Sequence, residues 1–408
     1  MNRIVSLTLL LLLSSSVAAA SFSSRGHAEV RHQQRAGNPD GEPLKQRYQA
    51  LLEGQLSNGR LTAKAIALGR YRSQYNQAST ASEVRDEMRH DAELREYFLS
   101  WSGDTFELRA GKQQQAWGRA DYFRIVDVWN PLDLREFLLP YFDNYSLGRQ
   151  PRGMLIGDYF ASQWEHQLVI APQAKTTRLA PAGSDFALSA MPASLPPQQQ
   201  PDKPVDIGWR GKTFWSGNDI ELYAFRGYQP DALFHLDQTK LYRRQTRRSM
   251  LGASLARPWG AWVIRSDLAY YPDESRQSGS AIEHSRRSRA LIGLDRVANE
   301  WSWNLQLANS HWYDRQPGHD DVWESSLALE KNWSRYRLSS GVLWLVNHVD
   351  NRHGQTSQLW RLTLSYEFLP QWKISAAALA FDGKNNTQFG QFDDQDRVYL
   401  SLRRDFSF

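Results

Sequence analysis

The sequence predicts an all-β fold: a single antiparallel β-barrel that crosses a membrane, with roughly 18 strands (about 16–18) and one inward-folded loop. The last residues, 398–408, alternate between apolar and polar side chains and end on Phe408. Such alternation places one set of side chains on each face of a strand. The same pattern recurs in segments of about ten residues, the length of a tilted membrane strand. Clear examples are residues 301–307 and 360–368.

The start of the chain predicts export from the cytoplasm. Met1-Asn2-Arg3 is a short basic segment, Ile4 to Leu13 is apolar, and Ala18-Ala19-Ala20 offers small residues for cleavage. These are the parts of a secretory signal peptide. We expect residues 1–20 to be removed and residues 21–408 to form a barrel in the outer membrane of a Gram-negative bacterium. No later apolar run has the length of a membrane-spanning helix.

Composition agrees with a barrel and excludes several other functions. The mean hydropathy is −0.61, yet the chain has 16 Trp, 17 Tyr and 17 Phe. Aromatic girdles at the membrane interfaces and a polar lumen explain that combination. The balance of 49 basic to 44 acidic residues does not indicate nucleic-acid binding, and the absence of cysteine excludes thiolate chemistry. We expect no metal and no cofactor.

Tight turns separate pairs of the alternating segments, and seven of them contain or adjoin a Trp. Gly, Asn and Pro at these positions suit hairpin turns. Short turns face the periplasm and long loops face outward in such barrels. The expected turns lie near residues 57–59, 102–104, 162–163, 216–218, 258–260, 298–299, 332 and 370–371. The expected long loops are 73–91, 115–151, 172–204, 229–244, 272–285, 314–320, 348–355 and 383–393. An even strand count then requires a first strand, for which 26–33 is the candidate.

The long connection 115–151 differs from the other loops. It is aromatic, charged and punctuated by Gly and Pro, without strict alternation. A loop this apolar needs burial, so we expect it to fold into the lumen and narrow the pore. Its candidate constriction residues are Trp117, Asp121, Phe123, Arg124, Asp127, Asn130, Asp133 and Arg135. The charged members would pair with each other or with lumen charges, and some would be simple structural ion pairs. We expect Asp121, Arg124, Asp127 and Arg135 to meet the wall through charge pairs. The stretch 172–204, rich in Pro, Ala, Ser and Gln towards its end, predicts a long surface loop.

Charged residues at inward strand positions predict a wet lumen wall. The alternation places them opposite the apolar, lipid-facing set on each strand. The candidates are Glu107, Arg109, Arg265, Asp267, Arg361, Glu367, Arg403 and Asp405.

One stretch resembles a known family. Gly111-Lys-Gln, Trp117-Gly, Asp121, Phe123, Asp127, Asn130-Pro131, Asp133 and Arg135 are similar to a "GRQ…WGxxDxF…NPxDxR" pattern of largely uncharacterised bacterial outer-membrane barrels. Lys112 stands where Arg is commoner, which keeps the charge but not the bidentate fork. The resemblance covers about 105–190, with a distant similarity to alginate-export-type porins. It implies transport, outward, of a lipid-like or polymeric substrate, beside an RND-type exporter and a periplasmic or lipoprotein partner.

Three functional hypotheses follow. The first is a channel, which as a barrel would also meet outer-membrane lipid and the barrel-assembly machinery. The second is a closed barrel with a structural or adhesive role, which differs only in whether the 115–151 loop seals the pore. The third, an outer-membrane hydrolase, is disfavoured because no G-x-S-x-G or H-E-x-x-H motif is present. His311, His319, His348 and His353 in neighbouring outer loops are the only hint of a metal or acid–base site.

Overall fold

A computed structural model describes residues 20–36, 45–77, 80–188, 196–237, 240–278, 281–313, 321–350 and 354–408. Its main sheet has 18 strands, and it closes because β1 (Ser21–Arg35) pairs with both β2 and β23. The prediction of a closed antiparallel barrel of about 18 strands is confirmed, with 21–35 as its first strand. Closure matters because it leaves no unpaired sheet edge.

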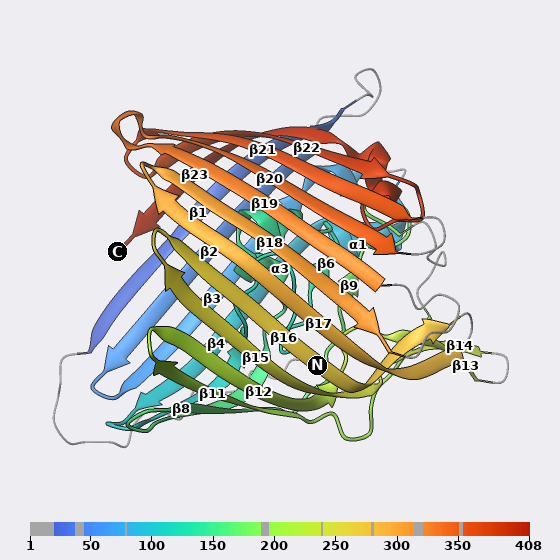
Figure 1. The fold of residues 1–408 in the computed structure, drawn as a ribbon. Coiled ribbons are helices and arrows are strands. Elements are labelled where there is room, and N and C mark those ends of the chain that lie inside the picture. Colours follow the sequence, from blue (N-terminus) through green and yellow to red (C-terminus); the bar gives the residue numbers. More distant parts are fainter. Residues whose placement is uncertain are drawn as a thin grey trace, which may run out of the picture.

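The remaining barrel strands pair with their neighbours along the chain (Figure 1). They are β2 (Lys45–Asn58), β3 (Leu61–Arg72), β4 (His90–Ser102), β5 (Phe106–Gln113), β7 (Arg152–Phe160), β8 (Glu165–Ala171), β11 (Asp206–Trp215), β12 (Asn218–Tyr228), β15 (Arg247–Trp259), β16 (Trp262–Ser278), β17 (Ala281–Ala298), β18 (Trp301–Trp312), β19 (Asp321–Trp333), β20 (Leu338–Asp350), β21 (Gln355–Leu369), β22 (Trp372–Gly383) and β23 (Arg397–Ser407).

Short elements decorate the barrel. The helices are α1 (Ser82–Met88), α2 (Leu139–Asp143) and α3 (Tyr145–Gly148), with 3-10 turns at Ser73–Asn76, Ser334–Tyr336 and Gly390–Gln395. In the described ranges, no helix is long and apolar enough to cross a membrane. The small strands β10 (Gln198–Gln199), β13 (Leu233–Asp237) and β14 (Lys240–Arg244) form one sheet, and β6 (Asp133–Leu134) pairs with β9 (Arg178–Leu179).

The hairpins divide into two ends. All eight expected short turns connect consecutive strands at the end where the chain terminates, and the longer connections lie at the opposite end (Figure 1). One expected long loop is wrong. Residues 272–285 are mostly strand, because β16 runs to Ser278 and β17 starts at Ala281, with a register shift after Tyr271. The expected loop 314–320 lies outside the described residues.

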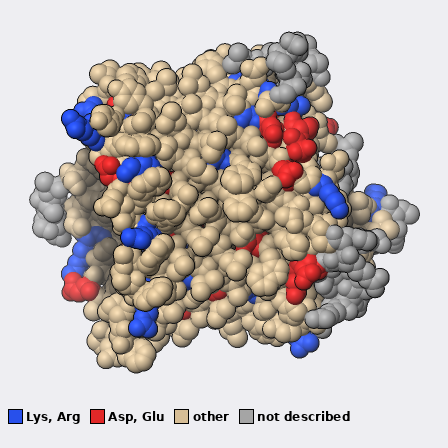
Figure 2. Space-filling view, turned by 45° about the horizontal axis from the view of Figure 1, so that its top comes forward, with Lys and Arg blue, Asp and Glu red and all other residues tan. Residues whose placement is uncertain are grey.

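The outer surface is apolar between the two ends. A broad band with few charged side chains crosses the barrel in Figure 2, and Lys, Arg, Asp and Glu gather towards its edges. The apolar outer surface includes Leu99, Leu251, Leu268 and Leu305, whose side chains are each about half exposed when no lipid surrounds the barrel. Period-2 alternation builds this band, because every second residue of each strand points outward.

Candidate functional site

The loop that joins β5 to β7, residues 114–151, lies inside the barrel (Figure 1). It carries β6, α2 and α3 and returns to the wall at Arg152. Irregular backbone at membrane depth requires burial in protein or contact with water. This loop uses both solutions: one side packs on an apolar part of the wall, and the other borders a polar cavity.

An apolar cluster joins the loop to one half of the wall. Trp129 is fully buried, and its ring meets Trp117 and Phe225 edge to face at 5.2 Å each. The other loop members are Phe123, Ile125, Val126 and Val128, and the wall members include Met154, Ile156, Val169, Tyr223, Met250, Tyr271 and Leu291. The expectation of a wet lumen wall is therefore wrong for this half of the barrel wall. Burial of several large side chains, each worth about 1.5–3 kcal/mol, fixes the loop against the wall.

The Trp117-Gly118 segment brings the loop backbone onto a wall carboxylate. Asp267 of β16 accepts hydrogen bonds from the amides of Arg119, at 2.9 and 3.0 Å, and of Ala120, at 3.0 Å. Gly118 has φ +92°, and a Cβ there would lie 2.6 Å from Val126 and 2.8 Å from Asp267. Only glycine permits this approach.

Asp121 is held by three wall side chains. Its carboxylate forms an ion pair with Arg265 and accepts hydrogen bonds from Asn304 at 2.7 Å and Gln306 at 2.9 Å. Arg265 also bonds Asp295 at 2.8 Å. Side chains of β16 and β18 thus hold the Asp121 carboxylate in place. The sequence predicted that its partners would be charged but did not identify them.

The central loop charges pair mainly with each other. Asp127 accepts from Arg124 at 3.2 Å and from Arg149 at 2.9 Å, both within the loop. Asn130 is fully buried, accepts from the amide of Gln115 at 2.8 Å and donates to the carbonyl of Gln150 at 2.9 Å. The expectation that Arg124 and Asp127 pair with wall charges is wrong. Wall contact here comes through Arg289, which donates to the carbonyl of Arg124.

The next segment meets a row of wall arginines. Arg135 pairs with Asp133 at 2.7 Å within the loop and with Asp91 of β4 at 2.9 Å. The neighbouring Glu136 is bound by Arg72 at 2.8 Å and Arg70 at 3.3 Å, both on β3. Burial opposes the ionisation of Glu136, but Arg72 and Arg70 hold its pKa well below the usual range. Sequence reasoning missed Glu136.

Asp143, at the end of α2, was also missed. It forms ion pairs with Arg31 of β1 and Arg361 of β21, each at 2.7 Å, and with Arg47 at 3.4 Å. Burial alone would raise its pKa, but Arg31, Arg361 and Arg47 lower the pKa of Asp143 to about 2. Arg361 also donates to the carbonyl of Phe142 at 3.0 Å. We call the contacts of Asp143 with Arg31, Arg47 and Arg361 the Asp143 latch.

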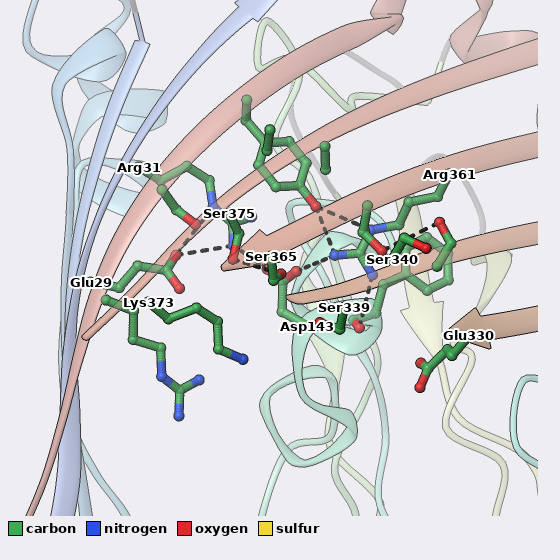
Figure 3. Close-up of a pocket in the computed structure, with 18 of the residues that line it drawn as sticks. Glu29, Arg31, Asp143, Glu330, Ser339, Ser340, Arg361, Ser365, Lys373 and Ser375 are labelled. Carbon is green, nitrogen blue, oxygen red and sulfur yellow. Dashed lines mark hydrogen bonds and ion pairs between the residues drawn. The ribbon is translucent and has the colours of Figure 1, made fainter. Parts of the chain in front are cut away.

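The Asp143 latch borders a polar cavity of about 310 Å³ (Figure 3). Strands β1 and β19–β23 supply most of its wall, and Phe142 and Asp143 supply the loop side. Its cationic side chains are Arg31, Arg361, Lys373 and Arg403, and its anionic ones are Glu29, Asp143 and Glu330. The remaining lining residues are mostly small or polar, and they include five serines, Asn332, Thr363 and Tyr399. The cavity can therefore hydrate and hold a charged group.

The predicted wall residues separate into two groups. Arg265, Asp267 and Arg361 contact the loop, as described above. The others do not: Arg109 pairs with Asp158 at 3.0 Å beside Glu107, Arg403 pairs with Asp405, and Glu367 accepts from the amide of Gln371 at 3.2 Å. The second group lies nearer the short turns, and of its members Arg403 lines the same cavity as Asp143.

The loop 172–204 is only partly a surface feature. Its described portion runs to residue 188 and resumes at residue 196. Phe186 stacks near Phe137 at 6.2 Å and joins a second apolar cluster with Leu139, Leu345, Phe381 and Phe392. The expected surface loop does not hold for Ala180 and Phe186, which are buried, whereas Pro172, Gln173, Arg178 and Gly183 are exposed.

The histidines do not come together among the described residues. His311 contacts Asp321 at 2.6 Å and His348 contacts Thr356 at 2.8 Å, whereas His319 and His353 lie outside the described ranges. No group of three or more His, Cys, Asp or Glu side chains that could hold a metal occurs in the described part.

Solved structures with a similar fold include the outer membrane protein opdK from Pseudomonas aeruginosa and a protein described as a BenF-like porin. Acinetobacter baumannii OccAB3 has a TM-score of 0.57 at 10% identity, over 96% of this chain and 100% of that chain. A BenF-like porin from Pseudomonas fluorescens Pf-5 has 0.57 at 9%, over 96% and 99%. Pseudomonas aeruginosa OccK2 (OpdF), in complex with glucuronate, has 0.53 at 10%, over 96% and 98%. At these identities the likeness concerns the fold.

No curated protein matches the chain. A family model described as "Protein of unknown function (DUF1302)" matches residues 40–285, more than half of the sequence. The match contains the loop 114–151 and most of the apolar wall residues that the loop packs against. The chain belongs to the DUF1302 family.

Proposed function

We propose that the protein is a channel of the Gram-negative outer membrane that carries a substrate with anionic groups, and that the Asp143 latch controls its opening. The observation that supports this most is the polar cavity beside Asp143. The guanidinium groups of Arg31 and Arg361 line this cavity, and both already bind the Asp143 carboxylate.

The latch suggests how a substrate could open the pore. Arg31 and Arg361 bind the Asp143 carboxylate at 2.7 Å each. A carboxylate or phosphate on a substrate can form the same charge-assisted hydrogen bonds. By competing for these guanidinium groups it would release α2 from the wall. Two solved structures of similar fold were determined with carboxylates: Pseudomonas aeruginosa OccK2 (OpdF) in complex with glucuronate, and Pseudomonas aeruginosa OpdK with vanillate.

For the substrate and its direction we propose outward movement of a lipid-like or polymeric molecule, in partnership with an RND-type exporter and a periplasmic or lipoprotein component. The support is the family resemblance of residues 111–135. The anionic group required by the cavity narrows this class to acidic lipids or acidic polymers. Copurification of the exporter with the tagged barrel tests the partnership.

Single-channel recording in planar bilayers tests the channel itself. We expect small conductance steps from the purified protein, with longer openings when a dicarboxylate or acidic oligosaccharide is added. A neutral oligosaccharide of the same size should not lengthen the openings. A complete absence of conductance, also in the Asp143→Asn variant, would favour the closed structural barrel, which the tightly packed loop makes the second candidate.

A further inference from the structure

A groove of about 530 Å³ lies on the outside of the barrel, at the long-loop end of β4, β5, β7 and β8. The strands β5, β7 and β8 have only 8, 9 and 7 residues, whereas β16 and β17 have 17 and 18. The barrel wall is therefore shorter here than at β16 and β17. Pro151, Pro172, Gln173 and Lys175, from the connections that follow the strands, complete the groove.

Strand alternation shows which side chains face the membrane. On β5, Leu108 and Ala110 point outward and Lys112 shares their face, whereas Gln113 is buried inside. Lys112 lies opposite Tyr97 on one side and Gly153 on the other. Tyr97 and Leu155 are about half exposed and form apolar walls. The floor at Gly153 is open: a Cβ there would meet only the side-chain oxygen of Gln173, at 4.0 Å.

Two lysines place positive charge on this apolar groove. Lys112 donates to the carbonyl of Leu94 at 2.8 Å, and Lys175 donates to the carbonyl of Pro151 at 2.9 Å. Within the described ranges, neither ammonium group has a carboxylate within ion-pair distance. Glu93 is near enough to interact electrostatically with Lys175, but its carboxylate pairs with Arg95 at 2.8 Å. Burial, with the charges of Lys112 and Arg178, lowers the pKa of Lys175 to about 8. Carbonyl oxygens do not neutralise these two charges, so an anion would be stabilised between them.

We propose that the groove binds a phosphorylated lipid of the outer leaflet, with a phosphate on Lys112 and Lys175 and an acyl chain along Tyr97, Leu155 and Ile170. Charge complementarity selects the anion, since lysine ammonium groups suit phosphate as point charges. The apolar walls select an acyl chain, and the position at the long-loop end selects the outer leaflet. The proposal rests on the outer-membrane placement given above, but it needs no transport through the lumen.

Measurement of lipid binding to the purified barrel tests whether Lys112 and Lys175 bind the phosphate. Native mass spectrometry would measure retention of added lipid A by the wild type, by Lys112→Gln/Lys175→Gln, and by a control, Lys240→Gln/Lys384→Gln, whose lysines are exposed elsewhere at the same end. We expect about a tenfold or larger loss of affinity in the first variant only, because the charge-assisted hydrogen bonds to the phosphate are lost. Equal retention by both variants would overturn the proposal.

Two further measurements identify the ligand class. Dephosphorylated lipid A should bind the wild type as weakly as lipid A binds the double variant, and inorganic phosphate alone should not bind. Gly153→Leu should fill the groove and reduce lipid A binding while both lysines remain. Phosphate binding without lipid binding, or full lipid binding by Gly153→Leu, would overturn the proposal. Conductance of the same variants should stay at the wild-type value, so failure here is distinguishable from failure of the channel function.

Discussion

Thr363 and Leu364 are neighbours in β21 but face different surroundings. Leu364 is 49% exposed on the outer surface, whereas Thr363 lines the polar cavity. At such positions the strand alternation alone decides which substitutions are tolerated, because adjacent side chains point to opposite faces.

An arginine should therefore distinguish the two positions. At a lipid-facing site near the membrane midplane it costs about 2–4 kcal/mol, while in a water-filled lumen it can remain hydrated. We expect Leu364→Arg to lower the yield of folded protein in the outer membrane, measured by heat-modifiable gel migration, and Thr363→Arg to leave it close to the wild type. Equal yields would mean that the register is shifted by one residue.

Asp143 is the residue with the largest expected effect on the pore. The variant Asp143→Asn removes the carboxylate that Arg31 and Arg361 share, and breaking a buried ion pair costs about 3–5 kcal/mol. We expect the loop to leave the wall more often, which would raise the open probability in single-channel recordings. The matched control is Asp104→Asn, which breaks the exposed pair with Arg60 at the short-turn end. Equal open probabilities of the two variants would exclude a latch role for Asp143.

The pKa values predict when acid releases the loop. The pKa of Asp143 is about 2, below its ordinary value of 3.8, and that of Glu136 is also lowered. Groups with lowered values stabilise the folded state above the ordinary pKa, and this contribution is lost as the pH falls through the lowered value. We expect open probability to be constant from about pH 8 to about pH 5 and to rise below about pH 4. A rise centred near neutral pH would mean that other groups hold the loop.

Among the elements, the loop 114–151 is the one that, under the proposed function, would decide whether the lumen is open. It contacts the wall through the Trp117–Trp129 cluster, through Asp121 and Asp267, and through the Asp143 latch. The wall strands do not need it for hydrogen bonding, since each pairs with its neighbours. The loop inside the barrel is therefore separate from the strands that close the barrel.

Deletion of about 120–140 should widen the pore without preventing assembly. We expect higher single-channel conductance and admission of larger solutes in liposome swelling, with some loss of thermal stability because Tyr223, Phe225 and Tyr271 lose their apolar contacts. The control is removal of the β13–β14 hairpin, which projects beyond the barrel rim in Figure 1. Unchanged conductance after deletion of 120–140 would show that the loop has no part in transport.

For the whole molecule, the separation of short turns from long loops sets its orientation in the membrane. The chain contains no cysteine, so single cysteines can be labelled without background. We expect Lys240→Cys to react with a membrane-impermeant maleimide on intact cells, because the long loops face outward. Asp104→Cys, at a short turn, should react only after the outer membrane is permeabilised. The reverse labelling pattern would show that the barrel is inserted in the opposite orientation.

The sequence determined the number of barrel strands, their faces and the short turns, but not the extension of β16 and β17 over 272–285. Each of these depends on neighbouring residues: alternation is visible within one strand, and turn residues lie within a few positions. The alternation also placed Arg265, Asp267 and Arg361 on the inner face. It did not reveal the apolar half of the wall, although β7 and β8 carry apolar residues on both faces, at Met154 to Ile156 and Leu168 to Ile170.

Only the tertiary structure decided which partners the loop meets. Asp143 and Arg361 are 218 positions apart, and Asp121 and Gln306 are 185 apart. Composition could show that the loop needs burial, but many inward charges on the wall were equally available to it. The closed barrel brings β1, β16, β18 and β21 around the loop, and this geometry selects Arg31, Arg265, Gln306 and Arg361. The site depends on contacts between strands far apart in the chain, which local patterns do not encode.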